Sequence, residues 1–163
     1  MHELSTDFDR NDKPASYERL RRQLAALLEG ESDLIANAAN TSALLYTTLP
    51  EVNWVGFYLL RAGELVLGPF QGKPACVRIG LGKGVCGTAA SQRVTVRVGD
   101  VHAFPGHIAC DPASRAEIVI PLIKAERLVG VLDIDSPELG RFDEIDQRGL
   151  EALAAVMINA SHA

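Results

Sequence analysis

The sequence predicts an α+β domain in which helices at both ends of the chain flank a central antiparallel sheet of about six strands. Two observations support this prediction. Near both termini, apolar residues recur every three or four positions, which is typical of amphipathic helices. Between them, short runs rich in β-branched and aromatic residues alternate with turn residues, which is typical of strands. Helices and strands grouped in this way belong to the α+β class.

The N-terminal part of the chain predicts an arm and two helices. Residues 1–13 are polar and indicate a flexible arm, and residues 14–163 form a single domain. The first helix starts at Ser16 and ends at Gly30, a residue that favours helix termination. Ser32 is the expected cap of the second helix, which stops before Pro50.

The middle of the chain contains six predicted strands, at residues 53–60, 64–70, 76–79, 94–98, 117–123 and 128–135. The first two strands form a hairpin around Ala62-Gly63, and the last two flank a turn at residues 124–127. After the third strand, a glycine-containing loop leads into a short helix whose first turn holds Cys86. Residues 99–115 form a long irregular segment, and such segments usually carry function.

The last helix starts near Asp143. Its spacing of apolar residues predicts an inward-facing stripe. The residues of this stripe are Phe142, Ile145, Leu150, Leu153, Met157 and Ile158.

Composition excludes several classes of protein. The chain has 163 residues, of which 47% are hydrophobic and 23% charged, as in an ordinary globular domain. The net charge of −5 provides no basic field for a nucleic acid. No apolar run reaches the roughly 20 residues of a membrane helix, so no membrane partner is expected. The start lacks the layout of a secretory signal, which indicates a cytoplasmic protein with reduced thiols.

The three cysteines, Cys76, Cys86 and Cys110, all lie between residues 72 and 120. Their odd number argues against a disulfide scaffold, and a chain of this length can bury a core without one. Their position near histidines and acids indicates redox or nucleophilic chemistry, for which one attacking and one resolving thiol suffice. Alternatively, each is a small buried apolar residue.

The environments of two cysteines favour reactivity. Cys110 lies in the long irregular segment after His102 and His107, and Asp111 follows it. Cys86 is expected at a helix N-terminus, where the helix dipole favours the thiolate. The two histidines are weak signals by themselves, and an ordinary place in a surface loop is the simpler interpretation of each.

Two other interpretations of the cysteines are weaker. The spacings from Cys76 to Cys86 and from Cys86 to Cys110 are too long for a short chelating pair, so no metal or other cofactor is expected. A cysteine–histidine hydrolase is possible because both residue types are present. That interpretation leaves the acids of the last two strands unexplained.

Acidic and aromatic residues lie at regular spacing on the predicted strands. Asp133 and Asp135 are two residues apart, so both face the same side of a strand, and Glu117 lies on the neighbouring strand. Burying carboxylates together is unfavourable unless they bind a cation or share a proton. Alternatively, they lie beyond the strand end in solvent. Trp54 and Tyr58 share one face of the first strand, either in the core or as a wall for a ligand.

Taken together, the segments NWVGFYLL, GPFQGKPAC, GKGVCGTAA, DVHAFPGHIACD, SRAEIVIPL and GVLDIDSP resemble the free methionine-R-sulfoxide reductases, which are GAF-domain enzymes. The resemblance runs from Ser16 to the final helix. It implies a GAF-like domain with the N- and C-terminal helices packed on one face of the sheet and the active-site loops on the other.

The resemblance also implies roles for individual residues. Cys110 would be the attacking cysteine, Cys76 its principal resolving partner, and Cys86 a third cysteine that lines the pocket and can serve as an alternative partner. Trp54 and Tyr58 would form the wall for the methyl sulfinyl end of the substrate. The substrate-binding acids would be Glu117, Asp133 and Asp135. Independently of the resemblance, carboxylates crowded in a closed pocket have raised pKa values, so one of them can donate a proton, with Glu117 as the first candidate and Asp135 as the second.

The expected function is therefore reduction of free L-methionine-(R)-sulfoxide through a sulfenic acid and an intramolecular disulfide. No cofactor is expected beyond an external dithiol protein of the thioredoxin type, and the amphipathic terminal helices favour a homodimer. A non-catalytic GAF domain that senses a small ligand, or a general thiol redox switch, remain the alternatives at this point.

Overall fold

The computed structural model describes residues 4–108 and 111–163. Within these residues the strands form one sheet in the order β3-β2-β1-β6-β5-β4, and neighbouring strands are antiparallel. The strands are β1 (Trp54–Arg61), β2 (Glu64–Gly72), β3 (Arg78–Gly80), β4 (Val96–Val98), β5 (Ala116–Lys124) and β6 (Arg127–Ser136). The prediction of an α+β fold with a six-stranded antiparallel sheet is confirmed.

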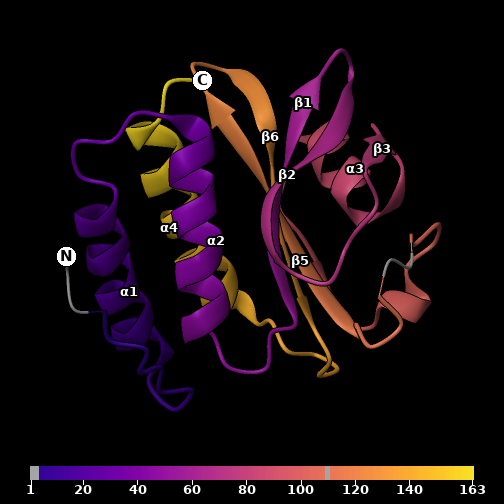
Figure 1. The fold of residues 1–163 in the computed structure, drawn as a ribbon. Coiled ribbons are helices and arrows are strands. Elements are labelled where there is room, and N and C mark those ends of the chain that lie inside the picture. Colours follow the sequence, from indigo (N-terminus) through magenta and orange to yellow (C-terminus); the bar gives the residue numbers. More distant parts are fainter. Residues whose placement is uncertain (1–3, 109–110) are drawn as a thin grey trace.

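Helices cover the two faces of the sheet unequally (Figure 1). Three helices, α1 (Lys13–Leu27), α2 (Leu34–Thr48) and α4 (Glu144–Ala160), lie on one side. The short helix α3 (Gly84–Gln92) and the segment with the 3-10 turn η1 (Val101–Ala103) lie on the other. The two-sided arrangement that the resemblance implied is therefore present.

The main core lies between the sheet and the three long helices. Every second residue of the central strands points into it, and each of those strand residues is at most 4% exposed. They are Val55, Phe57, Leu59, Ile118, Ile120, Leu132 and Ile134. Burial of one such side chain stabilises the fold by about 1.5–3 kcal/mol. The intervening residues of the same strands face α3, where a second, smaller core contains Trp54, Tyr58, Val119 and Val131.

The starts of the first two helices differ from those predicted. Helix α1 begins before Ser16, because the side chain of Asp12 caps it by accepting a hydrogen bond from the amide of Ala15. Helix α2 is capped by Asp33 and not by Ser32, since an Asp33 carboxylate oxygen accepts the Ala36 amide at 2.9 Å. Aspartate satisfies the free amides of a first turn as well as serine does.

Helix α4 starts as predicted, with Asp143 and Asp146 forming a capping box. The prediction for Ile145 is wrong, because this side chain is 39% exposed. The inward position belongs to the next residue, Asp146, whose carboxylate accepts a hydrogen bond from the Tyr17 hydroxyl at 2.6 Å and contacts the buried guanidinium of Arg141 at 3.3 Å. This buried polar network rotates the inward face of the helix away from Ile145.

The described part of the N-terminal segment lies against the domain. The ring of Phe8 packs edge-on against Tyr17 with 5.0 Å between centroids, and Arg10 forms an ion pair with Glu138 at 2.8 Å. The flexibility expected for residues 1–13 stays a prediction. No helix among the described residues is long and apolar enough to cross a membrane.

Candidate functional site

The register of the sheet brings the predicted acids together. Asp135 on β6 pairs with Trp54 on β1 and with Glu117 on β5, so these three residues form one row across the sheet. Asp133 lies opposite Gly56 in the neighbouring row. All face α3, and strand β6 continues through Ser136, so the alternative that the acids lie beyond the strand end is wrong. Glu117 and Asp133 are each only 6% exposed.

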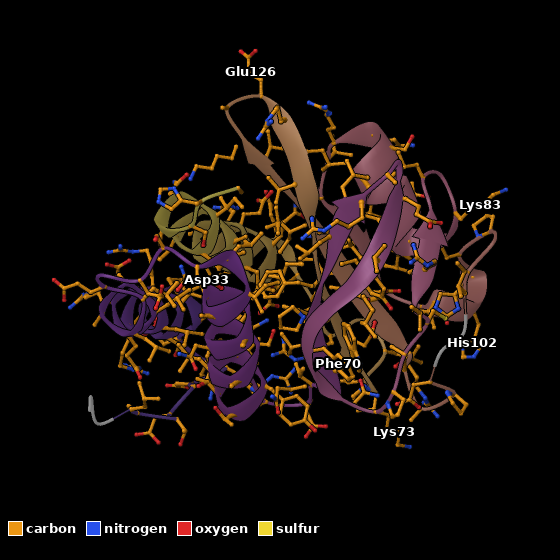
Figure 2. The ribbon with its side chains drawn as sticks, turned by 45° about the horizontal axis from the view of Figure 1, so that its top comes forward. Asp33, Phe70, Lys73, Lys83, His102 and Glu126 are labelled. Atoms are coloured by element: carbon orange, nitrogen blue, oxygen red, sulfur yellow. The ribbon has the colours of Figure 1, made fainter. Side chains whose placement is uncertain are left out.

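These rows form the floor of a pocket. The enclosed part of the pocket is small, about 40 Å³, which suits a water molecule or an ion. Its lining combines strand, helix and loop residues. They are Trp54, Tyr58, Lys73, Pro74, Ala75, Ile79, Lys83, Gly84, Val85, Cys86, His107, Ile108, Asp111, Ser114, Glu117, Asp133 and Asp135. Figure 2 shows Lys73, Lys83 and His102 at the edge of the molecule on the pocket side of the sheet. Asp33, the N-cap of α2, lies on the opposite side.

Trp54 forms the aromatic side of the pocket and is held in place on several sides. Its ring stacks on Phe70 with 5.3 Å between centroids and on Tyr58 with 6.0 Å. Its indole N–H donates a hydrogen bond to the Lys73 carbonyl at 3.0 Å. The Tyr58 hydroxyl donates to the Cys76 carbonyl at 2.8 Å. Both predicted aromatic residues therefore lie in the pocket wall in fixed orientations.

Two glycines make room for the indole. A Cβ atom at Gly56 would lie 2.6 Å from the Trp54 ring, and one at Gly72 would lie at the same distance from it. Any larger residue at either position would displace the ring, because real Cβ contacts are never this short. Glycine at these two positions is therefore required by the position of Trp54.

The pKa values of the three acids are raised, which favours protonated carboxyl groups or a proton shared between two of them. Burial, followed by the charge of Asp133, raises the pKa of Glu117 and of the less enclosed Asp135 well above the usual range. Burial also raises the pKa of Asp133, but hydrogen bonds with Glu117 and Cys86 offset part of that rise. The arrangement favours a proton on Glu117 and the negative charge on Asp133.

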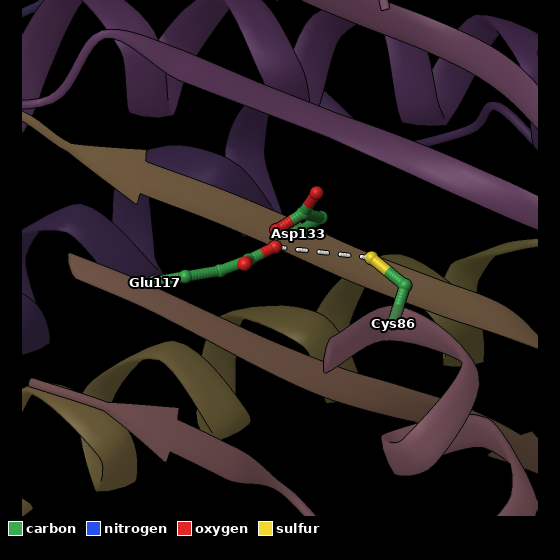
Figure 3. Close-up of side chains that lie close together, drawn as sticks. All are labelled: Cys86, Glu117 and Asp133. Carbon is green, nitrogen blue, oxygen red and sulfur yellow. Dashed lines mark hydrogen bonds between the residues drawn. The ribbon is translucent and has the colours of Figure 1, made fainter. Parts of the chain in front are cut away.

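Cys86 lies in the first turn of α3, as predicted, but its protonation state is the opposite of the one expected. Burial and the charges of Asp133 and Glu117 raise the pKa of the Cys86 thiol well above its usual range. Its S–H points at Glu117, with 4.0 Å from Sγ to the nearest carboxylate oxygen (Figure 3). Burial, together with the charge of Asp133, outweighs the helix dipole, so Cys86 is a neutral thiol.

His107 is a pocket residue that the sequence signalled only weakly. Its Nε2 lies 3.8 Å from a carboxylate oxygen of Glu117. Burial, followed by the charge of His102, lowers the pKa of His107, while the pKa of Glu117 is raised. Both shifts favour the neutral form of the group, so the contact is polar in character and not an ion pair. Asn53 and Ser114 were not predicted as site residues either.

Of the other two predicted site cysteines, only Cys76 lies among the described residues. Cys76 lies in the loop before β3 and is disulfide-bonded. Cys110 lies outside the described residues. The chain on either side of it lines the pocket at Ile108 and Asp111. Asp111 is anchored there, because the Asn53 side-chain amide donates to its carboxylate at 3.3 Å.

Among residues 4–108 and 111–163, one group of side chains has donor atoms close enough together to hold a metal ion. The ligand atoms of Cys86, Glu117 and Asp133 all lie within 4.8 Å of one another, and all three side chains are buried. Figure 3 shows the three side chains converging from α3, β5 and β6. Their positions in sequence form no short chelating motif, so only the fold reveals the group.

Comparisons with known proteins agree with this geometry. Residues 38–160 match the family model described as a GAF domain. The chain is 55% identical over 144 residues to the free methionine-R-sulfoxide reductase of Escherichia coli, covering 88% of this chain and 87% of that protein.

Two solved structures are also similar. One is a free methionine-R-sulfoxide reductase from Neisseria meningitidis in complex with its substrate, with TM-score 0.92 and 47% identity, covering 98% of this chain and 95% of that chain. The other is fRMsr of Staphylococcus aureus in complex with substrate, with TM-score 0.85 and 53% identity, covering 88% of this chain and 94% of that chain.

Proposed function

The chain belongs to the free methionine-R-sulfoxide reductases of the GAF-domain family, and from this premise we propose that it reduces free L-methionine-(R)-sulfoxide to L-methionine in the pocket between α3 and the sheet. The observation that carries the proposal is the group formed by the buried Glu117 and Asp133 and the half-buried Asp135 beside the Trp54 ring. Such a pocket combines a site for a cation, a proton donor and an apolar wall.

The pocket chemistry matches a free amino acid. The ammonium group of the substrate compensates the charge on Asp133, which is otherwise buried at a high energetic cost. A peptide-linked residue has a neutral amide in place of the ammonium and leaves that charge uncompensated, so it is excluded. The S-methyl end packs against Trp54 and Tyr58. The exposed Ile108 side chain also lines the pocket, so we expect it to change position when the substrate binds.

The proposed reaction transfers one oxygen atom from substrate sulfur to enzyme sulfur. The thiolate of Cys110 attacks the sulfoxide sulfur, and Glu117 donates its proton to the sulfoxide oxygen. The attack forms an S–S bond. This bond and the S–O bond of the substrate then break as the protonated oxygen bonds to the Cys110 sulfur, so methionine leaves and Cys110 is oxidised to a sulfenic acid. The Cys76 thiol then condenses with the sulfenic acid, which forms a disulfide and releases water. A thioredoxin-type dithiol reduces this disulfide and restores both thiols.

Three features of the described residues support these roles. Cys76 is disulfide-bonded, as a resolving cysteine is after one turnover. The raised pKa of the Cys86 thiol makes it a weaker nucleophile than an exposed cysteine, which leaves it the secondary partner. The raised pKa of Glu117 keeps a proton available near neutral pH.

Single-turnover assays with prereduced variants test the proposal. Cys110→Ser should form no methionine from free methionine-(R)-sulfoxide. Cys76→Ser should form about one equivalent and then stop when thioredoxin is the reductant. The (S)-epimer and the N-acetylated sulfoxide serve as controls and should not react. Methionine formation by Cys110→Ser at the wild-type rate would refute the assignment, and complete inactivity of the wild type would favour a ligand-sensing GAF domain.

A further inference from the structure

We propose that the reduced protein binds a thiophilic divalent cation of the Zn²⁺ type through Cys86, Glu117 and Asp133, and that this ion and the substrate exclude one another. The ion binding is independent of the catalytic assignment. The exclusion of substrate rests on the proposed function, because it requires the sulfoxide to occupy the same acids.

The geometry of the three donors suits one ion. In a tetrahedral zinc site, a thiolate and a carboxylate oxygen lie roughly 3.4–3.6 Å apart. Here Cys86 Sγ is 4.0 Å from a Glu117 oxygen, and the donor atoms of all three residues lie within 4.8 Å of one another. Rotation of the side chains closes such a difference without backbone movement. The donors come from three different elements, which holds them in place around a central point (Figure 3).

A second observation points to a missing ligand at this place. The Oδ1 atom of Asp133 is buried and has no hydrogen-bond partner among the described residues, although the residue lines the pocket and is only 6% exposed. A buried carboxylate oxygen without a partner destabilises the fold, because it has lost its hydrogen bonds to water. A cation bound to this oxygen removes that penalty. The enclosed volume of about 40 Å³ accommodates an ion.

The donor types select the class of ion. One sulfur and two carboxylate oxygens suit Zn²⁺ and its spectroscopic substitute Co²⁺, whereas Mg²⁺ and Ca²⁺ prefer oxygen ligands alone. His107 faces the other oxygen of Glu117, so the fourth position is left to a water molecule. Binding converts the Cys86 thiol and the acids to their anionic forms and releases their protons to solvent. No oxidation or reduction is involved.

Titration of the reduced protein with CoCl2 tests the site directly, because a cobalt–thiolate bond has a charge-transfer absorption in the near ultraviolet. The double variant Cys76→Ser/Cys110→Ser retains Cys86 as its one thiol and should still show this band. Asp133→Asn should weaken cobalt binding by about tenfold or more, since even indirect partners of metal ligands contribute roughly 10–100-fold. The exposed His102→Asn is the matched control and should bind as the parent does.

The outcomes separate the two parts of the inference. Absence of the band in the double variant, or an unchanged cobalt affinity in Asp133→Asn, would overturn the site, and urea unfolding of each variant checks that it is folded. Free methionine-(R)-sulfoxide should displace cobalt from the double variant, which cannot turn over. A cobalt band that persists at saturating sulfoxide would overturn the mutual exclusion while leaving the ion site intact. An inactive wild type would remove the basis of the mutual exclusion and would leave the cobalt titration of the ion site unaffected.

Discussion

Replacing Glu117 by glutamine should change how the stability of the protein depends on pH. The pKa of Glu117 is raised from 4.5 to well above that value in the folded protein, chiefly by burial. Between these two values the folded protein holds one proton more than the unfolded chain. The free energy of unfolding of the wild type therefore falls as pH rises above about 4.5, by roughly 1.4 kcal/mol per pH unit for this one group.

Glutamine keeps the shape and a hydrogen-bond donor but does not titrate. From pH 5 to pH 7 the slope for one group amounts to about 2.7 kcal/mol, so Glu117→Gln should gain up to that amount relative to the wild type. Asp133 and Asp135 also have raised pKa values and remain in the variant, so a residual slope of the same sign persists. The comparison uses the slope, which separates titration from any change in packing.

Urea unfolding at pH 5, 6 and 7, followed by circular dichroism, measures this effect for wild type and variant. Glu126→Gln is the matched control, because this glutamate lies at the exposed tip of the β5–β6 turn (Figure 2) and should follow the wild type at every pH. The same Glu117→Gln variant should lose proton donation and form methionine more slowly. Parallel stability profiles for wild type and Glu117→Gln would show that Glu117 is ionised in the folded protein and would refute the reasoning.

Two further substitutions test the packing that positions the site. Gly56→Ala places a methyl group 2.6 Å from the Trp54 ring, so it should reduce the free energy of unfolding by about 1–3 kcal/mol. It should also weaken sulfoxide binding, which the fluorescence of this single tryptophan measures. Gly99→Ala is the control, because a Cβ atom at Gly99 would lie no closer than 3.9 Å to another atom, and it should change neither stability nor sulfoxide binding. Equal effects of the two substitutions would contradict the claim that Gly56 makes room for the Trp54 ring. Asp146→Ala leaves the fully buried guanidinium of Arg141 without its carboxylate and should destabilise by about 3–5 kcal/mol in urea unfolding. A loss below about 1 kcal/mol would show that this ion pair is not what holds α4 in place.

The fold class could be predicted from local patterns because backbone geometry sets their period. Alternation along β1 and β6 separates the residues that face the long helices from those that face α3, and it placed Asp133 and Asp135 on one side correctly. Turn glycines followed by small residues predicted the short helix α3, and the three- to four-residue periodicity of apolar residues predicted the three long helices. This periodicity could not distinguish Ser32 from Asp33 as a cap, because both residue types accept the amides of a first turn.

Errors arose where a residue far away in the sequence decides the outcome. Ile145 fits the apolar stripe of α4, but the hydrogen bond between Asp146 and Tyr17, which are 129 residues apart, sets the inward face. The wall residues Trp54 and Tyr58 could be proposed from their spacing, whereas the glycines that make room for the indole have no sequence signal that distinguishes them from turn glycines.

The sequence by itself determined the order of helices and strands, the two-sided sheet and the residue types of the pocket, since these follow from short-range periodicity and motif. Only the tertiary structure decided that Cys86 is a neutral thiol and that His107 lies beside Glu117. Protonation depends on burial and on charges within a few ångströms, and here those charges come from strands that pair only after folding.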